Sequence, residues 1–373
     1  MSAEPLGAGF TVAITVNGPG EVATWAAPVV AELARSFPEA RVGLFLLPCR
    51  FAAGTEADVL RHAMPDLTVF TPAQSRPYIT HGQAPEGWRP TARGVVLFLG
   101  GEPLLARLLA RRLGYPCWGF VAKTDRPSRY FDVSLLEAEI GHPIVDGQRS
   151  FAADLTGSPQ RLVFFPGSRP QHANLAVQVY RGVIEALGRH ELPADLQLRV
   201  ARSPFLDLDR VSEDARRFVL EHEASPEELL HIRLAVAIPG SMTVELGARG
   251  VPFVLVLPII LRYARHFHFP GLAGILGNLP LIGPPIKMLI IRGIRQRHAL
   301  MALPNQRAGR QIAPEVAGRV TPEDIADTVA ELLADPPRLA TIAAELQAAM
   351  GPPGAPGRIV ARLREYAQAG VAA

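Results

Sequence analysis

The chain has 373 residues, 48% of them hydrophobic and 20% charged, and a formal net charge of +3 at pH 7. These values are typical of a globular protein, and the length predicts two domains of ordinary size with separate cores. The two cysteines, Cys49 and Cys117, exclude a disulfide framework and lack metal-ligand spacing, so we expect a reducing, cytoplasmic location. Met1–Phe10 has no basic segment followed by an apolar one, and we expect no signal peptide.

Apolar runs alternate with amphipathic stretches through the first half of the chain. Continuous apolar runs are typical of buried strands in a parallel sheet that is covered on both faces. Helical patterns lie between several of them, at Val22–Ser36 and Leu104–Leu113. The predicted strands are Phe10–Val16, Val42–Leu47, Leu67–Thr71, Val95–Leu99 and Cys117–Ala122.

The same pattern restarts after Ser150–Gln160. The predicted strands of the second half are Leu162–Phe165, Leu196–Val200, Ile232–Ile238 and Pro252–Leu257, followed by helices at Thr321–Leu333, Pro337–Ala349 and Arg358–Ala369. Thr321 and Asp324 form a variant capping box. Two successive βαβ sheets predict an α/β pair of doubly wound domains that binds its ligand at strand C-termini between them. We therefore expect an N-terminal domain at 1–155, a second domain at 160–350 and a C-terminal helix within 351–373.

Three short loops of the second half, Phe164–Arg169, Pro239–Glu245 and Leu303–Arg310, carry the clearest chemical signal. The first two each end an apolar run and lead into a helical pattern, where a Gly-Ser turn exposes backbone N–H groups to an anion. Arg169 adds a planar donor suited to phosphate. Glu245 is placed to accept hydrogen bonds from ribose hydroxyls. Each loop alone also fits ordinary helix capping, but together they predict a nucleotide diphosphate site.

The order and wording of these loops resemble lipid-A-disaccharide synthase, a membrane-associated glycosyltransferase family of the GT-B fold. The resemblance covers residues 160–345 well and the first 150 residues loosely, and Leu303–Arg310 is its most specific segment. It implies two Rossmann-like domains facing a central cleft, with a UDP-sugar held by the loops and the C-terminal helix within 351–373 packing back toward the N-terminal domain. The donor-binding residues that follow are Gly167, Ser168, Arg169, Gly240, Ser241, Thr243, Glu245, Asn305 and Arg310.

Between Leu246 and Pro314 the sequence has no Asp or Glu, but it has eight arginines and Lys287. Within it, His266–Ile286 is uncharged and long enough to span a membrane, yet its four prolines and four glycines argue against a spanning helix. We expect residues 259–300 to form an apolar wedge with a basic rim that binds an anionic membrane surface, at about 1 kcal/mol per basic residue. The rim is formed by Arg262, Arg265, Lys287, Arg292, Arg295 and Arg297. A buried loop or an oligomer contact remains the alternative, and sparse aromatics disfavour nucleic acid.

Two loops of the first half carry carboxylates. Glycines before Glu21 allow a ligand to approach the backbone, although Glu21 also suits a helix N-terminus. The resembled family shares Gly20-Glu21 but has Asp where this chain has Trp25, which suggests an altered acceptor pocket. It has an Asp-Ala-Pro-Asp turn at the fourth strand, where neither Asp is retained. Glu102 lies on that turn and is the substitute catalytic base, with Glu21 as the second candidate.

The histidines give no clear ligand set. His172 replaces a family Glu beside the first loop, and it either stabilises a leaving group or is an ordinary helix-face residue. No metal or other cofactor is expected, because GT-B enzymes neutralise the diphosphate with helix dipoles and basic side chains.

These observations predict an inverting glycosyltransferase that is peripheral on the inner membrane face. It transfers a sugar from a UDP-sugar, such as UDP-GlcNAc or an acylated derivative, to a lipid-linked acceptor. The sequence leaves open whether the protein forms a homodimer. A non-hydrolysing UDP-sugar epimerase and a catalytically inactive nucleotide- or lipid-binding GT-B protein are the alternatives. The P-loop and dinucleotide-binding glycine motifs do not follow a predicted strand, which disfavours kinase and hydride-transfer chemistry.

Overall fold

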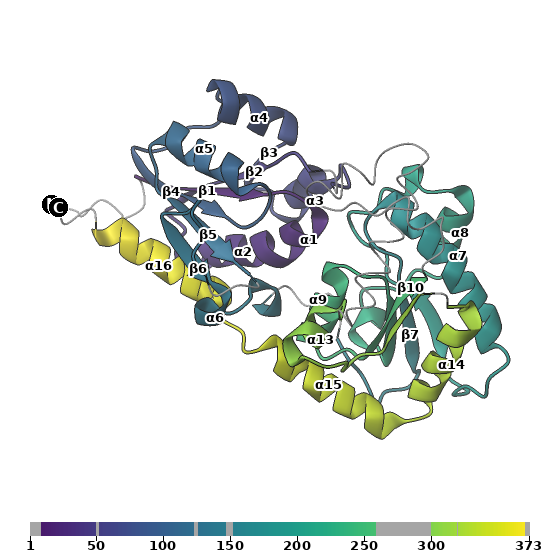
Figure 1. Ribbon diagram of the computed structural model, residues 1–373. Coiled ribbons are helices and arrows are strands. Elements are labelled where there is room, and N and C mark those ends of the chain that lie inside the picture. Colours follow the sequence, from purple (N-terminus) through teal and green to yellow (C-terminus); the bar gives the residue numbers. More distant parts are fainter. Residues whose placement is uncertain are drawn as a thin grey trace. The chain divides into compact units, whose positions relative to one another are not determined.

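The structure, a computed structural model, describes residues 9–49, 52–122, 126–146, 152–258, 300–318 and 320–369. The chain divides into two compact units (Figure 1). Unit 1 comprises Met1–Gln148 with Gly351–Ala373, and unit 2 comprises Arg149–Met350. Apart from residue 300, the predicted membrane-binding insert 259–300 lies outside the described residues.

Unit 1 is built on a six-stranded parallel sheet in the order β3-β2-β1-β4-β5-β6. The central strands β1 and β4 are apolar and almost wholly buried, as expected for a sheet covered on both faces. The strands are β1 (Phe10–Val16), β2 (Arg41–Leu46), β3 (Thr68–Phe70), β4 (Arg93–Phe98), β5 (Cys117–Val121) and β6 (Val133–Leu136). The strand order reverses direction between β1 and β4.

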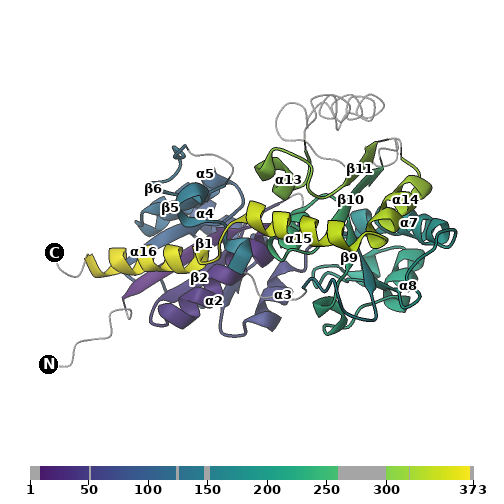
Figure 2. The same cartoon turned by 90° about the horizontal axis from the view of Figure 1, so that it is seen from below.

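Helices cover both faces of this sheet, with α4 and α5 on one side and α2 and α16 on the other (Figure 1). The C-terminal helix α16 packs against α2 and β4 (Figure 2). The helices of unit 1 are α1 (Pro19–Glu21), the π-helical turn η1 (Val22–Ala26), α2 (Ala27–Ser36), α3 (Glu56–Ala63), α4 (Pro72–His81), α5 (Pro103–Leu113), α6 (Glu137–Ile140), the 3-10 turn η2 (Pro143–Asp146) and α16 (Ala355–Ala369).

Unit 2 contains a five-stranded parallel sheet in the order β11-β10-β9-β7-β8. Its strands are β7 (Arg161–Phe165), β8 (Gln197–Val200), β9 (Leu234–Ala237), β10 (Phe253–Pro258) and β11 (Glu315–Gly318). Here the strand order reverses between β7 and β9, so each unit has one reversal point.

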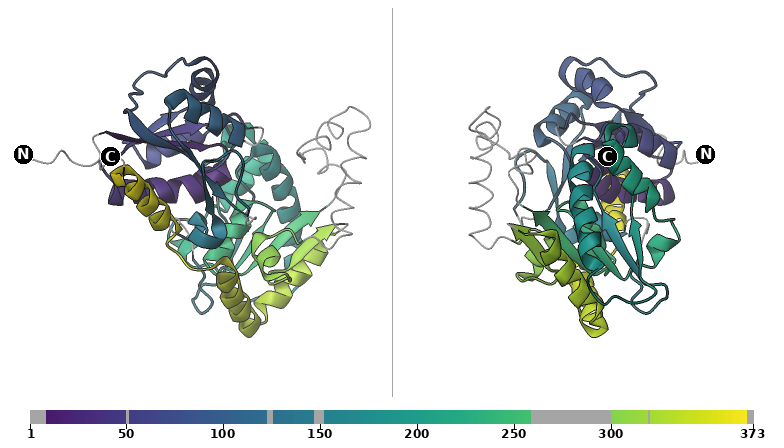
Figure 3. Two further views of the ribbon diagram at one scale, coloured as in Figure 1. Left: turned by 60° about the vertical axis from the view of Figure 1, so that its left-hand side comes forward. Right: turned by 90° about the vertical axis from the view of Figure 1, so that its right-hand side faces the viewer.

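Two groups of helices flank the second sheet (Figure 3). Helix α7 packs against α8 and α14, and α9 packs against α13 and α15. The helices are α7 (Pro170–Leu187), η3 (Leu208–Arg210), α8 (Glu213–Glu221), η4 (Glu228–Leu230), α9 (Ser241–Ala248), α13 (Leu303–Ala308), α14 (Pro322–Leu333) and α15 (Pro336–Met350). Helix α14 begins with the predicted capping box of Thr321 and Asp324.

The nine strands predicted from apolar runs are all present, with ends that differ by at most two residues. The short strands β6 and β11 were not predicted, because neither is a long continuous apolar run of the kind that marks a buried strand. Among the described helices, none is both long and apolar enough to cross a membrane.

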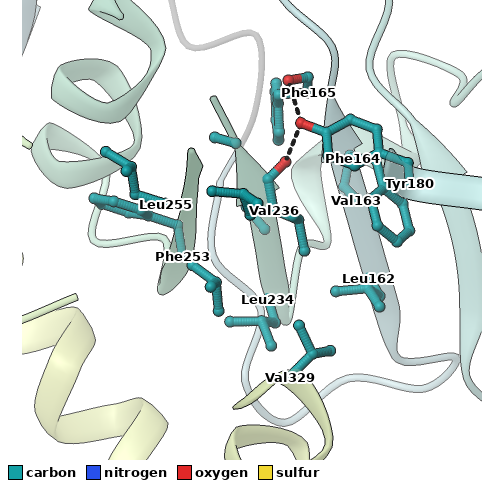
Figure 4. Close-up of a cluster of buried hydrophobic side chains, with 14 of the residues drawn as sticks. Leu162, Val163, Phe164, Phe165, Tyr180, Leu234, Val236, Phe253, Leu255 and Val329 are labelled. Carbon is teal, nitrogen blue, oxygen red and sulfur yellow. Dashed lines mark hydrogen bonds between the residues drawn. The ribbon is translucent and has the colours of Figure 1, made fainter. Parts of the chain in front are cut away.

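A buried tyrosine joins the two strands at the reversal point of unit 2 (Figure 4). The Tyr180 hydroxyl, on α7, donates to the carbonyl oxygens of Phe165 at 2.9 Å and Val236 at 3.5 Å. Its ring lies 4.9 Å from that of Phe164 within the main core of the unit. The hydroxyl therefore fixes α7 against the carboxyl ends of β7 and β9.

We expect Tyr180→Phe to lower the free energy of unfolding of unit 2 by about 1 kcal/mol, because a buried hydrogen bond is lost while the ring packing is kept. Urea denaturation followed by circular dichroism measures this change. Tyr366→Phe, at a side chain that is 40% exposed, is the matched control and should have no effect. Equal stability of wild type and Tyr180→Phe would show that the bridge contributes nothing.

Candidate functional site

The first two predicted loops leave the sheet of unit 2 side by side. Strands β7 and β9 are paired, with Phe165 opposite Ala237, so the residues that follow them emerge at adjacent positions. These are the strands between which the strand order reverses. In doubly wound sheets, ligands bind outside the carboxyl ends of the strands at such a reversal, or switch point.

The first loop requires a glycine for its own geometry. Gly167 has φ of +92°, and a Cβ added there would lie 2.9 Å from Ile238 Cδ1 in the second loop. Arg169 is the N-cap residue of α7, is half-buried and is followed by Pro170 in the first turn. The turn therefore brings Ser168 and Arg169 to the start of an 18-residue helix, where free N–H groups favour an anion.

The second loop has a different reason for its glycine. Gly240 is the N-cap residue of α9, and a Cβ added to it would meet no other described atom within 4 Å. Gly240 is exposed, and the described residues leave its Cα side open to solvent or to a ligand. Thr243 is buried, and its hydroxyl donates to the Gly240 carbonyl at 2.9 Å, so Thr243 holds the turn while Ser241 is exposed at the helix start.

Glu245 is a half-buried carboxylate on α9. Its Oε1 accepts from Arg249 Nη2 at 3.1 Å, one turn along the helix. Burial raises the pKa of Glu245 above its ordinary value, and the neighbouring Arg249 opposes that shift. The role of Glu245 in ribose recognition stays a prediction.

The third predicted segment has a structural role that the sequence did not indicate. The Asn305 side chain, 0% exposed, donates to Ala313 O and Glu315 Oε1 and accepts from the backbone N–H groups of Ile312 and Ala313, at 2.8–3.0 Å. All four hydrogen-bonding positions of the amide are used inside the protein. In this geometry the Asn305 amide has no hydrogen-bonding position left for a donor ligand.

Glu315 completes this network and was missed in the sequence. Its carboxylate also accepts from the N–H groups of Met301 and Ala302 at the start of α13. The sequence does contain a signal, because Glu315 is the first acidic residue after the acid-free stretch that ends at Pro314.

The two arginines of the third segment also make contacts within unit 2. Arg307 donates to Met350 O at 2.9 Å and so caps the end of α15. Arg310 is exposed and ion-paired with Glu345 on α15, at 2.9 Å. The guanidinium of Arg310 is thus engaged at the surface of unit 2, and its placement in the donor pocket stays a prediction.

The predicted carboxylates of unit 1 lie at that unit's switch point, between β1 and β4. Glu21 ends α1, and its Cβ and Cγ lie 3.0 Å from the position of a Cβ added to Gly100. Glu102, two residues beyond Gly100, is the exposed N-cap residue of α5 and makes no side-chain capping bond. The structure therefore brings both loops to one edge of the sheet.

Other titratable groups show less. His172 lies in the first turn of α7, close to Gly167. Burial raises the pKa of the Cys117 thiol to about 12, as expected for an inert core cysteine. Within the described ranges, no three His, Cys, Asp or Glu side chains gather as a candidate metal set.

The sequence matches no known protein family and no curated protein. Its fold is similar to a Listeria monocytogenes protein assigned as a UDP-N-acetylglucosamine 2-epimerase, with 12% identity and a TM-score of 0.50 over 96% of each chain. Acinetobacter baumannii MurG (13% identity, TM-score 0.48, 95% of this chain and 99% of that one) is also similar. So is the glycotransferase of kitacinnamycin (15% identity, TM-score 0.48, 97% of this chain and 100% of that one).

Two Rossmann-like α/β units in one chain define the GT-B fold class, as the sequence predicted. The low identity means that this likeness establishes the fold and no activity. The suggested relation to lipid-A-disaccharide synthase rests on the sequence resemblance alone.

We expect Asn305→Ala to lower the free energy of unfolding by about 2 kcal/mol or more, because two buried N–H groups lose their acceptor. Thermal and urea unfolding measure the loss. Gln306→Ala, at the exposed neighbouring position, is the control and should cost far less. A stable Asn305→Ala protein would contradict the structural role and return Asn305 to the list of ligand contacts.

Proposed function

We propose that this protein is a glycosyltransferase that uses a UDP-sugar donor, and that the donor binds at the switch point of unit 2. One observation carries the proposal: two adjacent loops, each with a glycine turn, place the N-termini of α7 and α9 at neighbouring strand ends. This arrangement suits a diphosphate, whose negative charge is stabilised by free N–H groups and helix dipoles.

The residues around these turns have defined parts in the proposal. Ser168, Ser241 and the turn N–H groups bind the diphosphate, and Arg169 supplies a full positive charge. Glu245 accepts hydrogen bonds from the ribose hydroxyls. The open space above Gly240 admits the diphosphate close to the backbone.

Unit 1 supplies the base in this proposal. Glu102 accepts the proton of the acceptor hydroxyl as its oxygen attacks the anomeric carbon, and UDP leaves from the opposite face with inversion. Glu102 is preferred over Glu21 because it is exposed, whereas Glu21 is half-buried and packs over Gly100.

The proposed acceptor is lipid-linked, and the protein is peripheral on an anionic membrane surface. This part rests on the sequence of the insert 259–300, where apolar residues are rimmed by arginines.

A UDP-sugar epimerase is the second candidate, because the structural neighbour with a TM-score of 0.50 carries that assignment. An epimerase acts on a soluble sugar nucleotide. That function would not explain why residues 259–300 have the sequence of a membrane-binding insert. The products distinguish the two functions.

We expect UDP to bind the full-length protein with micromolar affinity, and Arg169→Ala to weaken binding about tenfold or more through loss of a charge-assisted contact. Gly240→Ala should weaken UDP binding without lowering stability, because its methyl group would contact no described residue but would stand between the backbone and the diphosphate. Isothermal titration calorimetry, with and without anionic vesicles, measures both.

Arg310→Ala is the matched arginine control and should leave UDP affinity unchanged. The affinity for UDP should rise with pH as Glu245 ionises, because the ionised carboxylate accepts from both ribose hydroxyls and its pKa is raised by burial. Glu245→Gln should remove this pH dependence. The donor site is refuted if UDP binds neither in the presence nor in the absence of anionic vesicles.

Glu102→Gln should lower turnover by about 100-fold or more while UDP affinity is retained, because a base acts on the reaction and not on donor binding. The assay is UDP release from UDP-GlcNAc with a membrane lipid extract, and Glu21→Gln is compared in parallel. Full activity in both variants would exclude a base from these loops. An epimerised sugar nucleotide, without transfer to lipid, would favour the epimerase.

A further inference from the structure

The helix that follows β1 contains a π-helical turn. Residues Val22–Ala26 are π-helical between the α-helical segments α1 and α2, and the N–H of Ala27 donates to the carbonyl of Val22. π-Helical turns are rare in proteins. Where they occur, they often lie at functional sites, because the extra residue redirects the side chains beside it. Trp25 is one of the five residues of this turn.

Two buried rings hold Trp25 in place. The ring of Phe120 lies 5.1 Å from the indole at 83°, and that of His142 lies 5.4 Å away at 79°. Phe120 and His142 also pack edge to face with each other, at 5.5 Å. His142 accepts the backbone N–H of Ile144 through Nδ1, which fixes its ring. The indole is thus supported by rigid neighbours and is itself only half-buried.

The position of Trp25 relates it to the carboxylates of unit 1. Phe120 is the penultimate residue of β5, so Trp25 lies at the carboxyl edge of the sheet. Glu21 precedes Trp25 by four residues and packs over Gly100 at the end of the neighbouring strand β4. A partly exposed aromatic ring and two carboxylates, Glu21 and Glu102, therefore share one edge.

We infer that Trp25 is a specificity-determining residue that packs against the C–H face of a saturated sugar ring in the acceptor. A sugar ring offers an apolar face to an aromatic side chain and hydroxyl groups to carboxylates, so this combination suits it better than a bare lipid alcohol. The inference rests on the proposed function, and what it adds is the residue, Trp25, that makes the ring contact with the acceptor.

Fluorescence can test this inference because the three tryptophans differ in exposure. Trp88 and Trp118 are only 4% and 6% exposed, so acrylamide quenching reports mainly on Trp25. Methyl glycosides of N-acetylglucosamine, glucose and galactose are titrated into the full-length protein in the presence of UDP. At least one should reduce quenching about twofold, whereas sorbitol, which has no ring, should not. Equal effects of all glycosides and sorbitol would overturn the inference.

Two variants assign the signal and the contact. Trp25→Phe should remove most acrylamide quenching but keep glycoside affinity within about threefold, because an aromatic face remains. Trp25→Leu should weaken glycoside binding about tenfold, measured by calorimetry. UDP affinity should be the same in both, because the donor site lies in unit 2, and thermal unfolding followed by circular dichroism checks that unit 1 of each variant folds. Unchanged glycoside affinity in Trp25→Leu would refute the role of the ring.

The two proposals fail in different ways. UDP binding without glycoside protection of Trp25 refutes the sugar-bearing acceptor and leaves the donor site intact. Glycoside protection without UDP binding refutes the proposed donor site and retains a sugar site on unit 1.

Discussion

The reversal of strand order in each sheet is the constraint on which the rest of this structure depends. Crossovers between parallel strands are right-handed, so helices on either side of a reversal go to opposite faces and the loops between them diverge. In unit 1 the reversal separates β1 from β4, and in unit 2 it separates β7 from β9. Both candidate sites are built from the loops that follow these four strands.

The two reversal points have opposite chemical character. In unit 2 the loops present helix N-termini and Arg169, which suit an anion. In unit 1 they present Glu21, Glu102 and the indole of Trp25, which suit hydroxyl groups and apolar rings. One architectural feature used twice thus gives two loop clusters of different chemical character.

The sequence predicts the frame of the fold well because buried parallel strands such as β1 and β7 are continuous apolar runs. Edge strands carry less signal, and β11 contains Glu315, whose carboxylate serves α13 instead of a sheet face. Trp25 packs against Phe120 and His142, which are distant from it in the chain, so a local sequence pattern cannot reveal these contacts.

The third segment shows why a specific motif need not be a contact motif. A buried amide such as Asn305 and a ligand-binding amide need the same residue type, and the choice depends on whether the chain folds back to use it, as it does at Ala313 and Glu315. Pro304 packs within 2.5 Å of the position of a Cβ on Gly247, so α13 lies directly against α9. The Asn305 network therefore holds α13 in place, and through this contact it supports α9, the helix that carries Ser241 and Glu245.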